Sequence, residues 1–213
     1  MKTDELIALL ATGNEPVDQR MFARRLSLAI LVALIGAVLL TVVLFGVRDD
    51  IAVVAQTPLF WAKLALPATL MLGALLVFNR LVRPGLAVGP RWTGIGVPLL
   101  GVWAATLVVL SGVPEEQQLA LIFGRTWRTC PFNIALLSIP GFIALFRALQ
   151  ELAPTQLRLA GGVAGLLASA SATLAYCLHC PEMEVPFWGI WYVLGMAIPT
   201  VIGALLGPRL LRW

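Results

Sequence analysis

The chain has 213 residues, of which 60% are hydrophobic and only 12% are charged, and its formal net charge is +4. Soluble globular domains are far more polar, so this composition excludes that class and predicts an integral membrane protein. The positive charge does not indicate direct nucleic-acid binding, because the basic residues lie in short segments between apolar runs, where they set membrane topology.

The first segment, residues 1–25, is polar, and we expect it to form a short helical arm. Thr3 can cap a helix and Gly13 can close it. The apolar residues of this helix share one side: Leu6, Leu9 and Leu10. A helix this short cannot bury that side by itself. It fits either a groove on a partner protein or the surface of the inner leaflet, and physical reasoning favours neither.

Six apolar runs follow, each about 17–22 residues long, which is enough for a helix to cross a bilayer. They cover approximately residues 26–47, 60–78, 94–110, 130–146, 159–178 and 187–206. The first run has no small-residue cleavage site, so we expect it to be an uncleaved span. The fourth contains Pro131 and Pro140, so its boundaries are the least sharply marked. The sequence predicts an all-α protein, a six-helix transmembrane bundle over residues 26–213 behind the arm.

The distribution of basic residues predicts the orientation of the spans. Eleven of the 15 Lys and Arg residues lie in alternate segments: Lys2, Arg20, Arg24, Arg25, Arg80, Arg83, Arg91, Arg147, Arg158, Arg209 and Arg212. The other loops hold three: Arg48, Arg125 and Arg128. Since basic loops stay in the cytoplasm, both termini are expected there.

Charge inside the spans is almost absent. No Asp or Glu lies in any of the six runs, and Lys63 is the lone charged residue. Lys63 lies near the outer end of the second run, so we expect its ammonium group to reach the membrane interface. The lack of intramembrane carboxylates weakens the case for a small transporter driven by protons or ions.

Small residues recur every four positions in the fifth run: Gly161, Gly165, Ser169, Thr173 and Cys177. Such a stripe allows close contact between helices, so Cys177 is most simply a packing residue. Cys180 differs, because Pro181 follows it and places it beyond the helix end. Cys130 opens the fourth run, and the orientation above puts it on the same outer side as Cys180.

A disulfide between two of these cysteines requires Cα atoms within about 7 Å, a distance that the sequence does not give. Packing nominates Cys177 as the free thiol, but its pairing with Cys130 stays open. The thiols and His179 also include donors for a thiophilic metal ion. A single C-x-x-C is a weak metal signal, so we favour a reversible thiol switch, with no bound cofactor and no firmly predicted metal site.

Several stretches together resemble one family: the opening MKTDELIALLA, Pro16-Val17, the six spans, Cys130-Pro131, Leu178-His179-Cys180-Pro181-Glu182 and Trp191-Tyr192. The family is NrsF, negative regulator of sigma F, whose members are anti-sigma factors of the bacterial inner membrane. The resemblance covers essentially the whole chain.

The resemblance implies that the N-terminal segment holds an extracytoplasmic-function sigma factor at the membrane, with Leu6, Leu9 and Leu10 as the contact. It also implies that two periplasm-facing cysteines sense oxidants or heavy metals. By position these are Cys130 and Cys180, and Cys177 and His179 are possible contributors. The resemblance thus predicts stress-responsive transcription regulation by a protein that is not an enzyme.

The main competing hypothesis is a membrane thiol-disulfide oxidoreductase coupled to quinone. Such an enzyme needs an active C-x-x-C and a second relay pair, and this chain has three cysteines, one too few.

Overall fold

A computed structural model describes residues 3, 5, 19–83, 86–152 and 154–212, and these residues contain helices and no strand. In chain order the elements are α2 (Gln19–Leu44), α3 (Ile51–Val54), α4 (Pro58–Leu81), the 3-10 helix η1 (Gly89–Trp92), α5 (Thr93–Ser111), α6 (Glu115–Phe123), α7 (Cys130–Leu137), α8 (Ile139–Gln150), α9 (Leu157–Tyr176) and α10 (Val185–Leu210). The predicted all-α class is confirmed.

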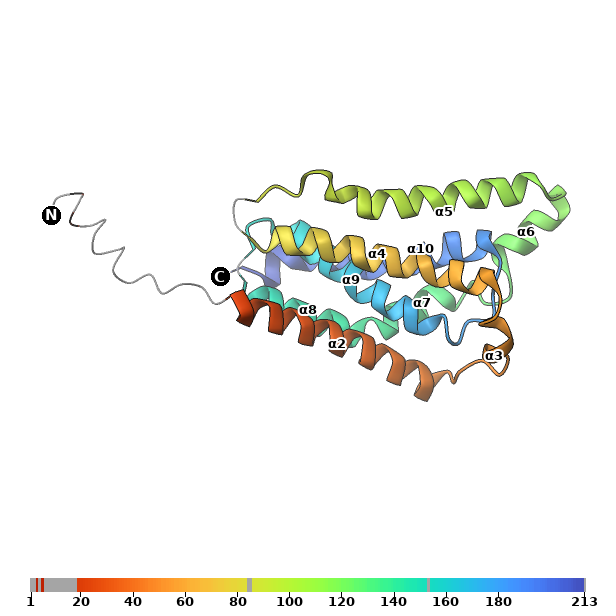
Figure 1. Cartoon of the computed structure of the whole chain (residues 1–213), viewed down its shortest axis with the longest axis horizontal. Coiled ribbons are helices and arrows are strands. Elements are labelled where there is room, and N and C mark those ends of the chain that lie inside the picture. The colour runs from red at the N-terminus through yellow and green to blue at the C-terminus, as the bar shows by residue number, and fades with distance from the viewer. Residues whose placement is uncertain (1–2, 4, 6–18, 84–85, 153, 213) are drawn as a thin grey trace.

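The long helices lie side by side along the long axis of the molecule (Figure 1). Five stretches are long and apolar enough to cross a membrane: Ala23–Leu44, Pro58–Leu81, Gly89–Ser111, Leu157–Tyr176 and Val185–Leu210. The pair α7 and α8 makes a sixth if the two count as one span, bent by 44°. Each predicted apolar run thus corresponds to one of these stretches, with ends that shift by a few residues.

The bend between α7 and α8 has a local cause in the sequence. Pro140 is the second residue of α8. Proline has no backbone N–H, which costs nothing in the first turn of a helix but removes a hydrogen bond inside a continuous helix. Ser138 ends one helix and precedes the next, and its hydroxyl donates to the Ala135 carbonyl. The fourth run therefore forms two helices. Two short helices that the sequence did not predict, α3 and α6, lie in loops at one end of the bundle (Figure 1).

Helix α9 is the most buried of the long helices and has its most extensive contacts with α10. The stripe of small residues faces α10, because a Cβ on Gly165 would lie 2.1 Å from the Pro199 carbonyl oxygen. A Cβ on Gly161 would lie 2.2 Å from the Gly203 carbonyl oxygen. Further along, the Ser169 hydroxyl donates to the Met196 carbonyl at 3.2 Å. The predicted packing stripe is therefore confirmed, and only glycine allows its closest contacts.

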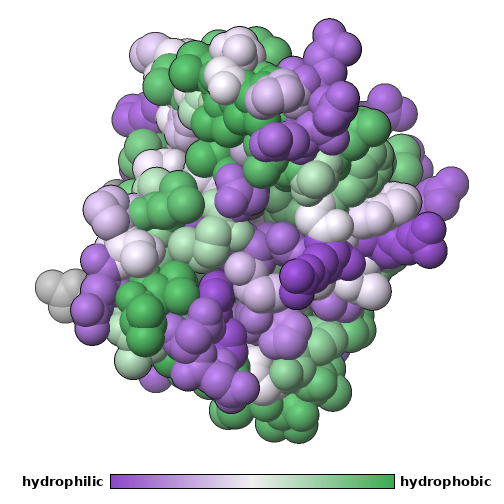
Figure 2. All heavy atoms as spheres, turned by 90° about the vertical axis from the view of Figure 1, so that its right-hand side faces the viewer, coloured by the Kyte–Doolittle hydropathy of each residue, from purple (hydrophilic) through white to green (hydrophobic). Residues whose placement is uncertain are grey.

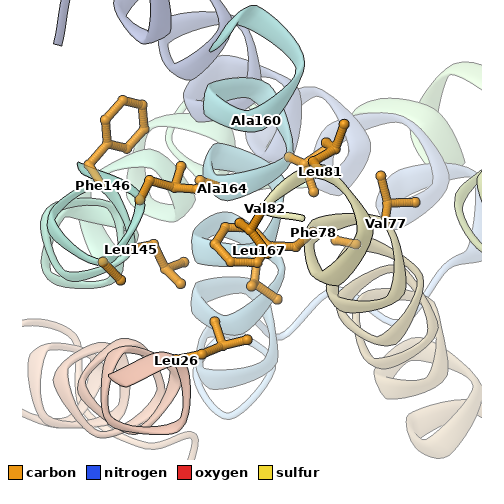
Figure 3. Packing of buried hydrophobic residues seen from close by; sticks show 14 of the residues in the cluster. Leu26, Val77, Phe78, Leu81, Val82, Leu145, Phe146, Ala160, Ala164 and Leu167 are labelled. Atoms are coloured by element: carbon orange, nitrogen blue, oxygen red, sulfur yellow. The ribbon is translucent and has the colours of Figure 1, made fainter. Parts of the chain in front are cut away.

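Two apolar clusters surround α9. One contains Leu26 of α2, Phe78 of α4, Leu145 of α8 and Leu167 of α9, which converge around the central helix (Figure 3). The other lies at the opposite end of α9 and contains all three cysteines. We call this the cysteine end, and we call residues 177–184, which join α9 to α10, the cysteine loop. The described start of α2 and the end of α10 lie at the other end (Figure 1).

Candidate functional site

The three cysteines come from three positions at the cysteine end. Cys130 is the first residue of α7, Cys177 is the C-cap of α9, and Cys180 lies in the cysteine loop. All three are free thiols and each side chain is completely buried. Cys180 is thus beyond the helix end, as the sequence predicts, but it is covered by the surrounding helices.

The end of α9 places Cys180 next to Cys130. The Cys180 amide donates to the Tyr176 carbonyl at 3.0 Å, which closes a last turn before Pro181 prevents further helix. The thiols of Cys130 and Cys180 are hydrogen-bonded to each other. The structure therefore brings together the two cysteines that the sequence placed on one side.

The two thiols of the C-x-x-C stretch have different acidity. The Cys130 thiol, which donates a hydrogen bond, and the positive charge of Lys63 lower the pKa of Cys180 below its usual value, although burial opposes this. Burial raises the pKa of Cys177 to about 12. Because the thiolate is the reactive form, this difference favours thiolate chemistry at Cys180 over Cys177.

Lys63 of α4 is completely buried, so the expectation that its ammonium group reaches the interface is wrong. Its Nζ donates to the Cys180 carbonyl at 2.8 Å and to the Glu182 carbonyl at 2.7 Å. It also lies 5.5 Å from the centre of the Tyr192 ring. These partners lower the free-energy cost of burying the ammonium group, compared with exposing it to lipid. They also fix the cysteine loop on α4.

Glu182 ties the other side of the cysteine loop to the segment before α7. Its carboxylate accepts from the amides of Arg125 at 2.7 Å and Thr126 at 3.2 Å. Gly124 precedes them with φ of 49°, and a Cβ there would lie 2.6 Å from this carboxylate. Glycine at position 124 therefore lets the Glu182 carboxylate come close to the backbone, and this contact holds the cysteine loop near Cys130.

Contacts with the end of α2 complete the fixation of the loop. The Arg48 amide donates to the Leu178 carbonyl at 3.1 Å, and its guanidinium donates to the Cys180 carbonyl at 3.2 Å. The guanidinium also pairs with Asp50, which raises the pKa of Arg48 and lowers that of Asp50. Nδ1 of His179 lies 3.1 Å from the Gly46 carbonyl, and its ring lies 5.3 Å from that of Phe45.

His179 thus contacts residues that follow α2. No group of three His, Cys, Asp or Glu side chains suited to a metal ion occurs in the described part of the chain. Leu6, Leu9 and Leu10 lie outside the described residues. Sequence reasoning missed the roles of Lys63, Arg48 and Glu182. The lone intramembrane charge of Lys63 was a usable signal, since such residues often mark functional sites.

Viewed onto the cysteine end, hydrophilic residues cross the middle of the face and reach its margins, with hydrophobic patches between them (Figure 2). The thiols lie beneath this surface, since each is completely buried. Only a small reagent, or a local opening of the loop, therefore gives access to Cys180.

Comparison with known proteins gives one consistent result. A family model described as "Negative regulator of sigma F" matches residues 10–213. The chain is 45% identical over 213 residues to the "Probable anti-sigma-F factor NrsF" of Azospira oryzae. It is 34% identical over 219 residues to the "Anti-sigma-F factor NrsF" of Caulobacter vibrioides. Both alignments cover 100% of this chain and 100% of the relative. No solved structure matches the chain.

Proposed function

Because the chain belongs to the NrsF family of negative regulators of sigma F, we propose that it is a membrane anti-sigma factor for an extracytoplasmic-function sigma factor. The observation that carries this proposal is the similarity over full length to relatives named as anti-sigma factors, which are regulators rather than enzymes. In the proposal, residues 1–25 sequester the sigma factor away from RNA polymerase. A redox or heavy-metal signal at Cys130 and Cys180 releases it.

The proposed setting is the bacterial inner membrane, with both termini in the cytoplasm and the cysteine end in the periplasm. Two observations support it. The helices are long and apolar enough to cross a bilayer, and the basic residues favour the end opposite the cysteines. The described start of α2 lies at that same end (Figure 1), which in the proposal is the side where a sigma factor acts.

The proposed signal is a change in the bonding of two neighbouring thiols. In disulfide formation, Cys130 and Cys180 together lose two electrons and two protons, and an oxidant accepts the electrons. In metal binding, the thiols lose protons to a thiophilic ion. Either reaction replaces the hydrogen bond between these thiols and so changes the position of the cysteine loop relative to α7.

The loop is also in contact with the residues that follow α2, and α2 is the helix that the arm enters. Arg48 and His179 form this connection, through the carbonyls of Cys180 and Gly46. We infer that a displaced loop shifts α2 and thereby the affinity of the arm. An affinity change of tenfold corresponds to about 1.4 kcal/mol, which a few altered hydrogen bonds can supply.

Replacement of the arm's apolar side tests the proposal. With the protein and its neighbouring sigma factor expressed together, the triple variant Leu6→Ala, Leu9→Ala, Leu10→Ala should retain at least tenfold less sigma factor on purification from membranes. The reason is the loss of the apolar side chains that fill the partner's groove. Sigma factor recovered per unit of membrane protein is the measurement.

The matched control is the triple variant Leu28→Ala, Leu31→Ala, Leu39→Ala. It removes three leucines of α2 that are each half exposed, and it should leave sigma-factor recovery unchanged. Wild-type recovery with the arm variant would rule out the proposed contact.

Breaking the connection to α2 should separate sensing from release. The double variant Arg48→Ala, His179→Ala should still form the oxidised thiol product. The amount of sigma factor that oxidant releases from it should be at least fivefold smaller than from the wild type. Arg128→Ala is the control, because Arg128 lies against the Trp127 ring and not against the cysteine loop. Gel-shift assay of the thiols and release from isolated membranes are measured in parallel. Normal release by the double variant would exclude this connection.

A further inference from the structure

Lys63 is a buried cation for which the described residues provide no carboxylate partner. The ion pairs found in the described part of the chain are Arg25–Glu151 and Arg48–Asp50, and neither involves it. Its two hydrogen-bond acceptors are backbone carbonyls, which carry partial charge only. A buried ammonium group is costly unless a full negative charge compensates it. The groups beside it that can become anionic are the thiols.

The charge of Lys63 acts on all three cysteines, but the surroundings distinguish them. It stabilises the thiolate form of Cys180 together with the Cys130 hydrogen bond and the amide of Glu182. At Cys177 burial prevails over the same charge, and the pKa is raised to about 12. Lys63 also binds the backbone carbonyl of Cys180 at 2.8 Å, so both its hydrogen bond and its charge favour a negative charge at Cys180.

The hydroxyl of Tyr192 also faces this group. It is buried beside Cys177 and Cys180, and apart from these thiols no hydrogen-bond partner for it is found among the described residues. Buried hydroxyls are nearly always paired. A thiolate at Cys180 is a stronger acceptor for this hydroxyl than a neutral thiol.

We propose that Lys63 is the positioning residue that holds Cys180 as an ammonium-stabilised nucleophile, so that the site reacts with small oxidants and electrophiles. This inference rests on the proposed function only for its consequence, the release of sigma factor. The ammonium group performs two tasks at once: it fixes the loop through the Cys180 and Glu182 carbonyls and neutralises the sulfur's charge.

With a hydroperoxide as oxidant, the chemistry is balanced in two steps. The Cys180 thiolate attacks the terminal peroxide oxygen, the O–O bond breaks, and Cys180 becomes a sulfenic acid while the leaving oxygen takes a proton. The sulfur of Cys130 then attacks the Cys180 sulfur, the S–O bond breaks, and water leaves with the thiol proton. With hydrogen peroxide, two thiols are oxidised to one disulfide and the peroxide is reduced to two waters.

The test uses the reduced full-length protein in detergent, without sigma factor. Iodoacetamide labelling is followed by mass spectrometry of Cys180, with Cys177 in the same molecule as the internal reference. In the wild type, Cys180 should react at least tenfold faster than Cys177, although both are completely buried. If Cys180 and Cys177 of the wild type are labelled at equal rates, the proposal is overturned by this measurement alone.

Lys63→Gln retains a hydrogen-bond donor but removes the charge, and it should slow Cys180 labelling and peroxide-driven disulfide formation at least tenfold. Lys63→Arg, which restores the charge, should recover the rate to within threefold. Labelling of Cys177, where burial prevails over the charge, should slow less than labelling of Cys180 in Lys63→Gln, so the ratio of the two rates should fall. A wild-type ratio of Cys180 to Cys177 labelling in Lys63→Gln, or no recovery in Lys63→Arg, would refute the charge effect. Because no sigma factor is present, these outcomes are independent of the co-purification test.

Discussion

Replacing Cys180 by Ser should abolish the proposed release of sigma factor by oxidant or heavy metal. We expect the response to fall from at least tenfold to less than twofold, and Cys130→Ser should have the same effect. Neither a disulfide nor a two-thiol metal complex can form with one of these thiols missing. Sigma factor in the soluble fraction, measured before and after treatment of cells, reports the response.

Cys177→Ser is the matched control, since it exchanges the same atoms three residues away. The Cys177 thiol is buried at the end of α9, and burial raises its pKa to about 12, so it takes little part in thiolate chemistry at neutral pH. This variant should respond within twofold of the wild type. A response that survives in Cys180→Ser would exclude the proposed switch.

The second large effect concerns the contact between α9 and α10. The double variant Gly161→Ala, Gly165→Ala should be strongly destabilised, because the added Cβ atoms would lie 2.2 Å and 2.1 Å from backbone carbonyl oxygens of α10. Backbone atoms cannot move aside as a side-chain end can, so the helices must separate. Overpacking costs about 1–3 kcal/mol per site, or more where the backbone must shift.

The control for this prediction is the double variant Gly96→Ala, Gly101→Ala in α5, where an added Cβ meets nothing within 4 Å. Alanine favours a helix over glycine, so this variant should match or slightly exceed wild-type stability. Thermal unfolding in detergent, followed by loss of the monodisperse chromatographic peak, compares the two. Equal midpoints for both variants would show that the α9–α10 contact is not as close as described.

Much of the fold follows from the sequence because it depends on local pattern. The lengths of the apolar runs predicted the five helices, and the bent pair α7 and α8, that are long and apolar enough to cross a membrane. Four-residue spacing predicted the face of α9 that packs against α10. The alternating direction of the spans predicted that Cys130 and Cys180 lie at the same end, but not that their thiols are neighbours. Pro140 marked the weak point of the fourth run, although its pattern did not show that two helices form.

The surroundings of the thiols could not be predicted, because they depend on pairs of residues far apart in the chain. Lys63 lies near one end of an apolar run, and for such a residue contact with the interface is the commoner outcome. Its actual partners are carbonyls that any residue could provide, so their identity leaves no mark in the sequence. In the sequence Arg48 indicates only topology, and nothing in the pattern marks its contact with the Cys180 carbonyl.

The buried position of Lys63 also has a consequence for biogenesis. Its carbonyl partners lie 117 and 119 residues further along the chain. At a synthesis rate of about 5–20 residues per second, the inserted second span waits roughly 6–24 seconds before those partners leave the ribosome. During that interval the ammonium group must stay at the bilayer surface or bind an insertion factor. Lys63 thus gains its final partners only when the last hairpin arrives, and a chain that ends before Cys180 leaves this buried ammonium group without them.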